Sequence, residues 1–259
     1  MAKQPVFLNL TDLHALSEYG PSLNKAATPQ QAWIAKKINA VYTKGVWFAN
    51  HGFEVNIGFG GEFVDEPGFQ ARNMAESLCE PFVRLARATG GKLHALRGTA
   101  YHVGEEGDED TAVAKSLGIW DVSEAKEFRL GGKLIWHSHH GPKPSPKPSA
   151  RANALNNAAS DIYFDCIERQ EPVPDLVIYG HWHQHQIGSW HYTDRKGAAR
   201  ELLVVSSPAW KLKDRYAHKV VPLWRPWIGA VWYLPLQHRI VPQLFGVPKQ
   251  FLRGKVGWQ

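Results

Sequence analysis

Residues 175–185 read DLVIYGHWHQH and give the first indication of the fold. The apolar run Leu176–Tyr179, bounded by a glycine, predicts a buried strand. Gly180 lets the backbone turn sharply as it leaves the sheet. His181 and His183 then project from one tight loop, where two imidazoles can hold a divalent metal ion. For an H-x-H pair taken alone, two surface histidines are the simpler interpretation, so the rest of the chain has to decide.

Length and composition indicate a globular protein. The 259 residues suffice for one large domain, and 44% hydrophobic with 21% charged residues is ordinary for a soluble chain. No segment has the length of a membrane span, and the first residues lack a signal-peptide core. The two cysteines, Cys79 and Cys166, form no C-x-x-C motif, which favours a reducing cytosol. The net charge of +6 favours polyanionic partners, so nucleic acid is a candidate partner; the sequence does not indicate an oligomeric state.

Similar apolar runs recur along the chain and alternate with helical patterns. Strands are predicted over residues 6–10, 53–59, 92–97, 133–136, 201–205 and 227–234. A helix is predicted from the cap Thr28, with Pro29 at its first position, to about Gly45. Further helices are predicted over residues 69–89, 149–169 and up to about residue 117. We expect the acidic stretch 105–110 before that third helix to be a solvated loop and helix start.

Metal-ligating residue types follow successive predicted strands. They are Asp12, His14, Glu62, Asp65, His102, His137, His139, His140, His181 and His183. Strands alternating with helices predict an α/β layered fold, in which ligands bind beyond the carboxyl ends of the strands. The alternative for Asp12 is a helix N-cap. A set rich in histidine and carboxylate but without cysteine indicates a hydrolytic site with one or two divalent metal ions.

Five motifs stand in order along the chain: D-L-H at 12–14, G-E-F-V-D at 61–65, G-T-A-Y-H at 98–102, H-S-H-H-G-P at 137–142 and G-H-W-H at 180–183. Together they resemble the calcineurin-like metallophosphoesterase superfamily, over about two thirds of the chain. The motifs G-T-A-Y-H, H-H-G-P and S-P-A-W further resemble a phage or prophage branch described as phosphatases. The resemblance implies an α-β-β-α sandwich with two mixed sheets and a metal site at the carboxyl ends of the strands. We expect residues 1–241 to form this domain, residues 242–259 to be an extension, and the protein to lie in the cytoplasm of a bacterial host or prophage carrier.

The resemblance also implies roles for the residues of a two-metal centre. Asp12, His14 and His183 would hold one ion, and Glu62 would bridge to the other. His181 and one of His137 or His139 would hold the second ion, and His139 is favoured because its H-H-G-P run fits the family pattern best. The ions would be Mn, Fe, Zn or Ni, with Mn favoured. His102 would be the catalytic general acid, and Asp65 would orient the loop or a ligating histidine.

The sequence departs from the family pattern at two positions. Glu62 stands where the family has aspartate, and Thr99 is the nearest polar residue to an expected asparagine ligand. The second ion would then be completed by Thr99, His102 or a water, while His137 and His140 are further candidates as ligands or as partners of ligands. Candidate substrate-binding residues are Arg97, Trp210 and Lys211. Trp210, Trp224 and Trp227 interleave with Lys211, Lys213, Arg215 and Arg225, a pattern that suits single-stranded nucleic acid.

Three functions are therefore open. The first is a metal-dependent phosphoesterase that hydrolyses phosphomonoesters or phosphodiesters through a hydroxide activated between two metal ions. The second is a nuclease of the same fold that acts on single-stranded nucleic acid, favoured by the positive charge. The third is a binding module that keeps the fold but has lost a working centre, favoured by the two departures from the family pattern.

Overall fold

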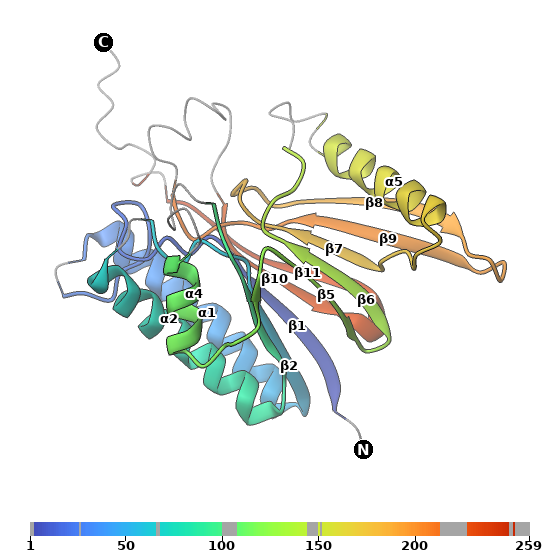
Figure 1. The fold of residues 1–259 in the computed structure, drawn as a ribbon. Helices are drawn as coiled ribbons and strands as arrows, with labels where there is room; N and C mark the ends of the chain where they lie inside the picture. The colour runs from blue at the N-terminus through green and yellow to red at the C-terminus, as the bar shows by residue number, and fades with distance from the viewer. Residues whose placement is uncertain are drawn as a thin grey trace, which may run out of the picture.

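A computed structural model describes residues 3–25, 27–65, 68–99, 108–143, 150, 152–212, 227–248 and 251. Its helices are α1 (Pro29–Asn50), α2 (Phe69–Thr89), α4 (Asp108–Ser116) and α5 (Asn153–Glu168), with a short 3-10 helix η2 (Pro235–Gln237). Two sheets pack face to face, with α1, α2 and α4 on one side of the pair and α5 on the other (Figure 1). The predicted α-β-β-α sandwich with two mixed sheets is confirmed.

The first sheet has the strand order β11-β10-β1-β2-β3-β4. Its strands are β1 (Gln4–Leu10), β2 (Phe53–Phe59), β3 (Leu93–Leu96), β4 (Val122–Ser123), β10 (Trp227–Leu234) and β11 (Arg239–Gly246). Strands β1 to β4 run parallel, whereas β10 and β11 pair antiparallel. The carboxyl ends of β1, β2 and β3 therefore lie at one edge of the sheet.

The second sheet has the strand order β5-β6-β7-β9-β8. Its strands are β5 (Ala125–Leu130), β6 (Lys133–Ser138), β7 (Leu176–Tyr179), β8 (Gln186–Thr193) and β9 (Ala199–Ser206). The central strands β6, β7 and β9 are parallel, and the two outer strands are antiparallel to their neighbours. As a result, the segments after β6 and β7 leave this sheet at the same end, where the carboxyl ends of the parallel strands lie.

Three buried clusters hold the layers together. One lies between the first sheet and its helices and includes Ile34, Ile57 and Phe82. A second lies between the two sheets and includes Phe7 and Ile178, and a third lies under α5 around Leu155. Each sheet is thus buried on both faces, which explains why strands such as β2 and β7 are continuous apolar runs.

The ends of the first two helices follow their predicted chemistry. Thr28 caps α1 in a reciprocal capping box with Gln31, and Gly90 ends α2 in the left-handed conformation. Helix α1 continues past its expected end at Gly45. A Cβ there would lie 2.6 Å from Leu85 Cδ2, so the bare backbone of this glycine allows α1 and α2 to pack closely.

The first sheet extends further along the chain, toward the C-terminus, than predicted. The expected boundary between residues 241 and 242 falls inside β11, and residues 242–246 continue its pairing with β10. The division of the chain into a domain and an extension stays a prediction. Within the described ranges, no helix is long and apolar enough to cross a membrane.

Two buried histidines connect the sheets between β3 and β6. His94 Nε2 lies 2.8 Å from His137 Nδ1, and both rings contact Phe7. Burial lowers the pKa of His94 to about 4 and also lowers that of His137. Both imidazoles are therefore neutral at pH 7, as expected for a desolvated pair.

Replacing His94 with glutamine is expected to make the protein less sensitive to acid. Because the folded-state pKa of His94 is about 4 against an ordinary 6.5, the unfolded chain binds more protons between these values, and stability falls as the pH falls through that window. Between pH 7 and pH 5 the wild type should lose about 2 kcal/mol more unfolding free energy than His94→Gln. The raised pKa values of Asp12 and Asp110 act in the opposite direction, but equally in both proteins. Urea unfolding at the two pH values measures this difference; equal losses would contradict it, and the exposed His191→Gln is the control.

Candidate metal centre

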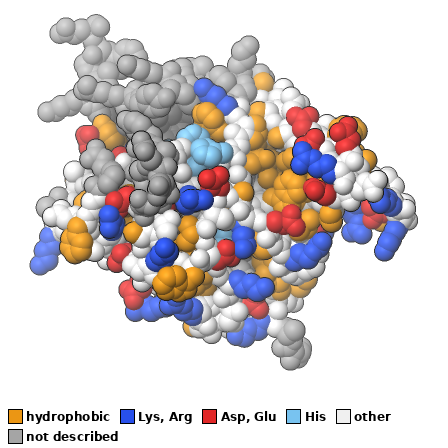
Figure 2. Space-filling view, in the orientation of Figure 1, with side chains coloured by type: hydrophobic (Ala, Val, Ile, Leu, Met, Phe, Trp, Pro, Cys, Tyr) orange, Lys and Arg blue, Asp and Glu red, His pale blue; other side chains and the backbone are white. Residues whose placement is uncertain are grey.

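Two groups of ligand-type side chains meet at the carboxyl ends of the parallel strands. The first contains Asp12, His14, Glu62 and His183, and the second contains His139, His140 and His181. In each group, one candidate ligand atom per residue lies within 4.8 Å of the others. The loops after β1, β2, β6 and β7 supply these residues, so both sheets contribute to the site. Figure 2 shows histidine atoms reaching the surface on the face drawn there.

In the first group, one nitrogen of each histidine faces another ligand-type atom. His14 Nε2 lies 3.0 Å from Glu62 Oε2 and 3.2 Å from His183 Nε2. The other ring nitrogen of His14 lies 2.9 Å from Asp65 Oδ1. Metal-ligating histidines commonly donate their second N–H to a carboxylate in this way, which fixes the tautomer and the ring orientation. Asp65 therefore lies beside His14, and its role in orienting this imidazole stays a prediction.

In the second group, the two ring nitrogens of His139 also face different partners. Nδ1 donates to the carbonyl of Gly60 at 2.6 Å, and Nε2 lies 3.3 Å from Glu62 Oε1. His181 Nδ1 lies 3.7 Å from the same carboxylate oxygen. Nε2 of His139 and Nδ1 of His181 therefore both point toward Oε1 of Glu62.

Glu62 contacts both groups through different oxygens. Oε2 faces His14, whereas Oε1 faces His139 and His181. Thr99 Oγ1 donates to Oε1 at 2.7 Å, so the threonine at the expected asparagine position holds this carboxylate. The two oxygens of this one carboxylate therefore contact both groups of candidate ligands.

The backbone is strained at five of the candidate ligands. Positive φ angles occur at Asp12 (51°), His14 (46°), Glu62 (53°), His181 (67°) and His183 (55°). Each such conformation costs a non-glycine residue about 1–3 kcal/mol and persists only where surrounding contacts impose it. Those contacts include the His14 N–H on Glu62 O at 2.9 Å and the His181 N–H on the Asp12 carboxylate at 3.0 Å. Among the described residues, five of the eight non-glycine residues with a positive φ are candidate ligands, so the strained turns are mainly those that carry the candidate ligands.

Burial and mutual contacts shift the pKa values of the side chains in these two groups. Burial raises the pKa of Asp12 to about 6. For His14 and His139, burial lowers the pKa, but hydrogen bonds to carboxylates outweigh it and raise both values to about 9. For Glu62, burial raises the pKa, but hydrogen bonds from the surrounding histidines hold it well below its usual range. A divalent ion would replace the protons on these imidazoles, so metal binding should release protons.

The residues present fit a metal ion on chemical grounds. His181 Nδ1 is buried and makes no hydrogen bond with any described residue. The paired nitrogens of His14 and His183, 3.2 Å apart, can share only one proton between them. Imidazole nitrogen and carboxylate oxygen are the ligands that suit first-row divalent metals. The structure therefore supports divalent metal binding here.

Asp110 is a residue of this site that the sequence reasoning missed. The expectation that residues 105–110 are solvated is wrong at this position, because Asp110 is fully buried. Its carboxylate accepts hydrogen bonds from the N–H groups of Glu62 (2.8 Å), Phe63 (2.9 Å) and Gly98 (2.7 Å). It thereby holds the turn that carries Glu62 against the end of β3. A buried carboxylate is acceptable when several donors satisfy it, and no local sequence signal reports donors that lie 48 positions away.

The other predicted site residues belong to neither group of candidate ligands. His137 points into the inter-sheet core beside His94 and is in neither ligand group. His102 lies outside the described residues, as do Lys213, Arg215, Trp224 and Arg225. Lys211 is buried, with Nζ 2.6 Å from Asp65 Oδ1. Arg97 is partly exposed just before Thr99 and lies 3.6 Å from Glu124.

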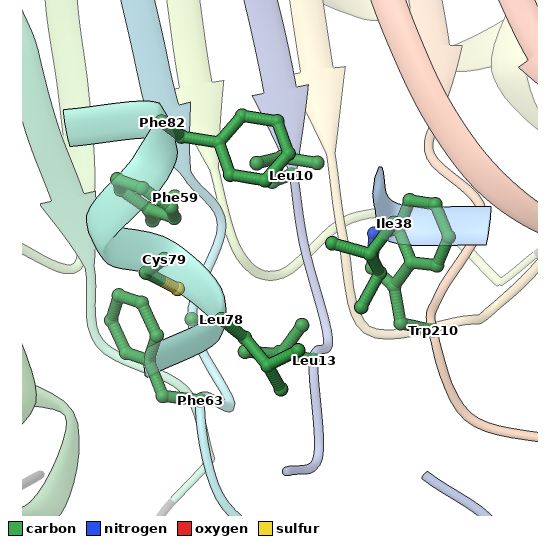
Figure 3. A pocket seen from close by; sticks show the side chains of 10 residues that line it. Leu10, Leu13, Ile38, Phe59, Phe63, Leu78, Cys79, Phe82 and Trp210 are labelled. Atoms are coloured by element: carbon green, nitrogen blue, oxygen red, sulfur yellow. The ribbon is translucent and has the colours of Figure 1, made fainter. Parts of the chain in front are cut away.

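Trp210 belongs to the core and not to a substrate surface. Its side chain is fully buried, and it lines a cavity of about 10 Å³ with Phe63, Leu78 and Phe82 (Figure 3). The prediction that Trp210 binds substrate is therefore wrong, because no part of its ring reaches solvent. Its indole N–H makes no hydrogen bond with any described residue.

Two tryptophans provide a matched test of that unpaired N–H. Trp232 is also fully buried, but its Nε1 donates to Gln243 Oε1 at 3.0 Å. Trp210→Phe should stay within about 1 kcal/mol of the wild type, since losing an unpaired buried N–H offsets the lost ring area. Trp232→Phe should be destabilised by about 1–2 kcal/mol more, because Gln243 loses its donor. Equal destabilisation in urea unfolding would contradict this account.

No family model and no curated protein matches the sequence. Several solved structures are similar. One is an archaeal phosphodiesterase, with 11% identity over 93% of this chain and 99% of that chain and a TM-score of 0.45. Another is YfcE, a phosphoesterase from E. coli, with 11% identity over 94% of this chain and 100% of that chain and a TM-score of 0.41. The NAD nucleotidase NadN of Haemophilus influenzae has 11% identity over 95% of this chain and 51% of that chain, with a TM-score of 0.40. Similarities at this level do not show a family. The chain is a layered α/β protein with a candidate metal centre at the carboxyl ends of its strands.

Proposed function

We propose that this protein is a metal-dependent phosphoesterase that hydrolyses phosphomonoesters or phosphodiesters at a two-metal centre. The observation that carries the proposal is the division of Glu62, with Oε2 facing His14 and Oε1 facing His139 and His181. Asp12, His14, Glu62 and His183 would hold one ion, and Glu62, His139 and His181 would hold the other. Mn²⁺ is our first choice of metal, ahead of Fe, Zn and Ni.

Two bound divalent ions would supply Lewis acidity, which lowers the pKa of water and offsets charge that develops on a phosphoryl group. The residues of the chain fix the geometry for that chemistry. Asp65 and the Gly60 carbonyl orient His14 and His139, and Thr99 orients the Glu62 carboxylate. His102, three positions after Thr99, is our proposed general acid, a role that imidazole fits near neutral pH. Arg97 and Lys211 remain proposed substrate-binding residues.

We place this activity in the cytoplasm. Cys79 and Cys166 are both buried and unpaired, as expected in a reducing compartment. The resemblance to a phage or prophage branch remains part of the proposal.

A substrate panel tests the proposal. The metal-stripped protein is supplied with Mn²⁺, Zn²⁺, Ni²⁺ or Fe²⁺ and assayed on bis-p-nitrophenyl phosphate, p-nitrophenyl phosphate and single-stranded DNA and RNA. Hydrolysis of either small ester, lost with a chelator and restored by metal, is the expected result. Cleavage of nucleic acid alone would favour the nuclease. No turnover on any substrate would contradict the proposal and leave the binding module.

A further inference from the structure

The three imidazoles of the second ligand group surround one small volume. The ring centroids of His139 and His140 are 4.9 Å apart, those of His139 and His181 are 5.3 Å apart, and those of His140 and His181 are 5.1 Å apart. Every pair of ring planes meets at a steep angle, between 65° and 74°. One nitrogen of each ring lies within 4.8 Å of a nitrogen of the other two, so the three imidazoles can share one ion.

Local contacts hold His140 in this arrangement. The Ser138 hydroxyl donates to the carbonyl of His140 at 3.0 Å. The Trp182 indole N–H donates to Gly141 O at 2.8 Å, which ties the loop of His181 to the residue that follows His140. A Cβ on Gly141 would lie 2.2 Å from the Tyr179 ring, so only glycine allows the chain to pass this close to the end of β7. The position of His140 is therefore built into the fold although its side chain is exposed.

The two ligand groups differ in chemistry. The first combines two carboxylates, from Asp12 and Glu62, with two imidazoles. The second consists of three imidazoles, and Glu62 Oε1 lies 3.3 Å from one of them, at His139 Nε2. Thr99, the alternative donor at this side, is engaged with that same oxygen at 2.7 Å. Imidazole suits Zn²⁺, Ni²⁺, Cu²⁺ and Fe²⁺, whereas carboxylate and water ligands suit Mn²⁺.

We propose that His140 is a ligand of the second ion. It would take the place of the asparagine that is expected from the family that the sequence resembles. The second site is then a three-imidazole site that binds Zn²⁺ or Ni²⁺ more tightly than Mn²⁺ but still fills when Mn²⁺ is supplied alone at saturating concentration, while the first site accepts Mn²⁺ readily. This inference rests on the proposed two-metal centre and adds its ligand set and metal preference.

Metal binding to the full-length, metal-stripped chain tests the inference without any substrate. Equilibrium dialysis against Zn²⁺ and Mn²⁺, followed by elemental analysis, gives the ions bound per chain and their affinities. The wild type should bind two Zn²⁺ per chain, and His140→Ala should bind the second Zn²⁺ about tenfold or more weakly. His140→Asn, which supplies an amide oxygen, should narrow the difference between Zn²⁺ and Mn²⁺ at that site. His191→Ala removes a histidine whose side chain is 75% exposed on β8 and serves as the control.

The outcomes separate this inference from the proposed function. Unchanged binding of both ions by His140→Ala, or uptake of only one ion by the wild type, would overturn the inference even if phosphate esters are hydrolysed. Loss of the second Zn²⁺ in His140→Ala, in a protein that hydrolyses no phosphate ester, would support the inference and contradict the proposed function. Because His140 is exposed, a folding defect is not expected, and thermal unfolding of the variants verifies this.

Discussion

Glu62→Gln is expected to lower kcat for phosphate-ester hydrolysis by about 10³-fold or more, with little change in the fold. The glutamine has the same shape and can still accept the hydrogen bond from Thr99. It lacks the negative charge, however, that faces His14 through one oxygen and His139 through the other. Loss of a shared anionic ligand removes several kcal/mol of transition-state stabilisation, at about 1.36 kcal/mol for each factor of ten.

The control for this substitution is Glu80→Gln, which removes a carboxylate of α2 whose side chain is 54% exposed. Its activity should equal that of the wild type. The measurement is steady-state hydrolysis at saturating metal, together with the number of ions bound per chain. If Glu62→Gln kept its rate within tenfold of the wild type, Glu62 would not be the residue that joins the two ion sites.

Asp110→Asn is expected to destabilise the protein by about 3 kcal/mol. One oxygen of Asp110 accepts the N–H groups of Glu62 and Gly98, and the other accepts that of Phe63. An amide can keep only one of these oxygens, so its NH₂ group would face a backbone N–H in a buried site. An unsatisfied buried donor costs about 1–3 kcal/mol, and losing a hydrogen bond to a charged group costs about 1.5–3 kcal/mol.

The neighbouring residue supplies a matched control for Asp110. Glu109→Gln removes the charge from a carboxylate that is 8% exposed and binds Arg72 through both oxygens, and it should cost about 1–2 kcal/mol because the glutamine oxygen can keep one of the two hydrogen bonds. Urea unfolding of the two variants measures the difference. Asp110→Asn should also weaken metal binding, because the turn that carries Glu62 loses its support. A variant as stable as Glu109→Gln would mean that the three hydrogen bonds contribute little.

The strand and helix predictions succeeded where the sequence signal was local. β2, β7 and β10 begin and end at the predicted residues, and so does α2. Their apolar runs and terminal glycines are determined by burial on both faces and by the turn that follows. The candidate metal ligands could be placed after successive strands because parallel strands bring their carboxyl ends together.

Outer strands gave no such signal. β5 reads AKEFRL, with charged side chains at half of its positions, and β8 contains Gly188 in its interior. Strands at the edge of a sheet are determined by the neighbour they pair with, and charges there prevent further pairing. A polar strand of this kind looks like a loop until the rest of the sheet is known.

The errors at the site have a related cause. Asp110 and Trp210 were interpreted from their local surroundings, an acidic run and a basic aromatic segment, and both are fully buried. Their burial depends on contacts with residues far away in the sequence, such as the N–H of Glu62 for Asp110 and the ring of Phe245 for Trp210. The place of His140 beside His181 likewise required the positions of two separate loops.

The most direct test of the account is Mn²⁺-dependent hydrolysis of bis-p-nitrophenyl phosphate by the wild type and by His181→Ala. His181 is part of the second ligand group, and its Nδ1 faces Glu62 at 3.7 Å. Metal-dependent turnover by the wild type that is lost in His181→Ala but kept in His191→Ala is the predicted result. Equal turnover in His181→Ala and the wild type would contradict a catalytic metal centre at this site.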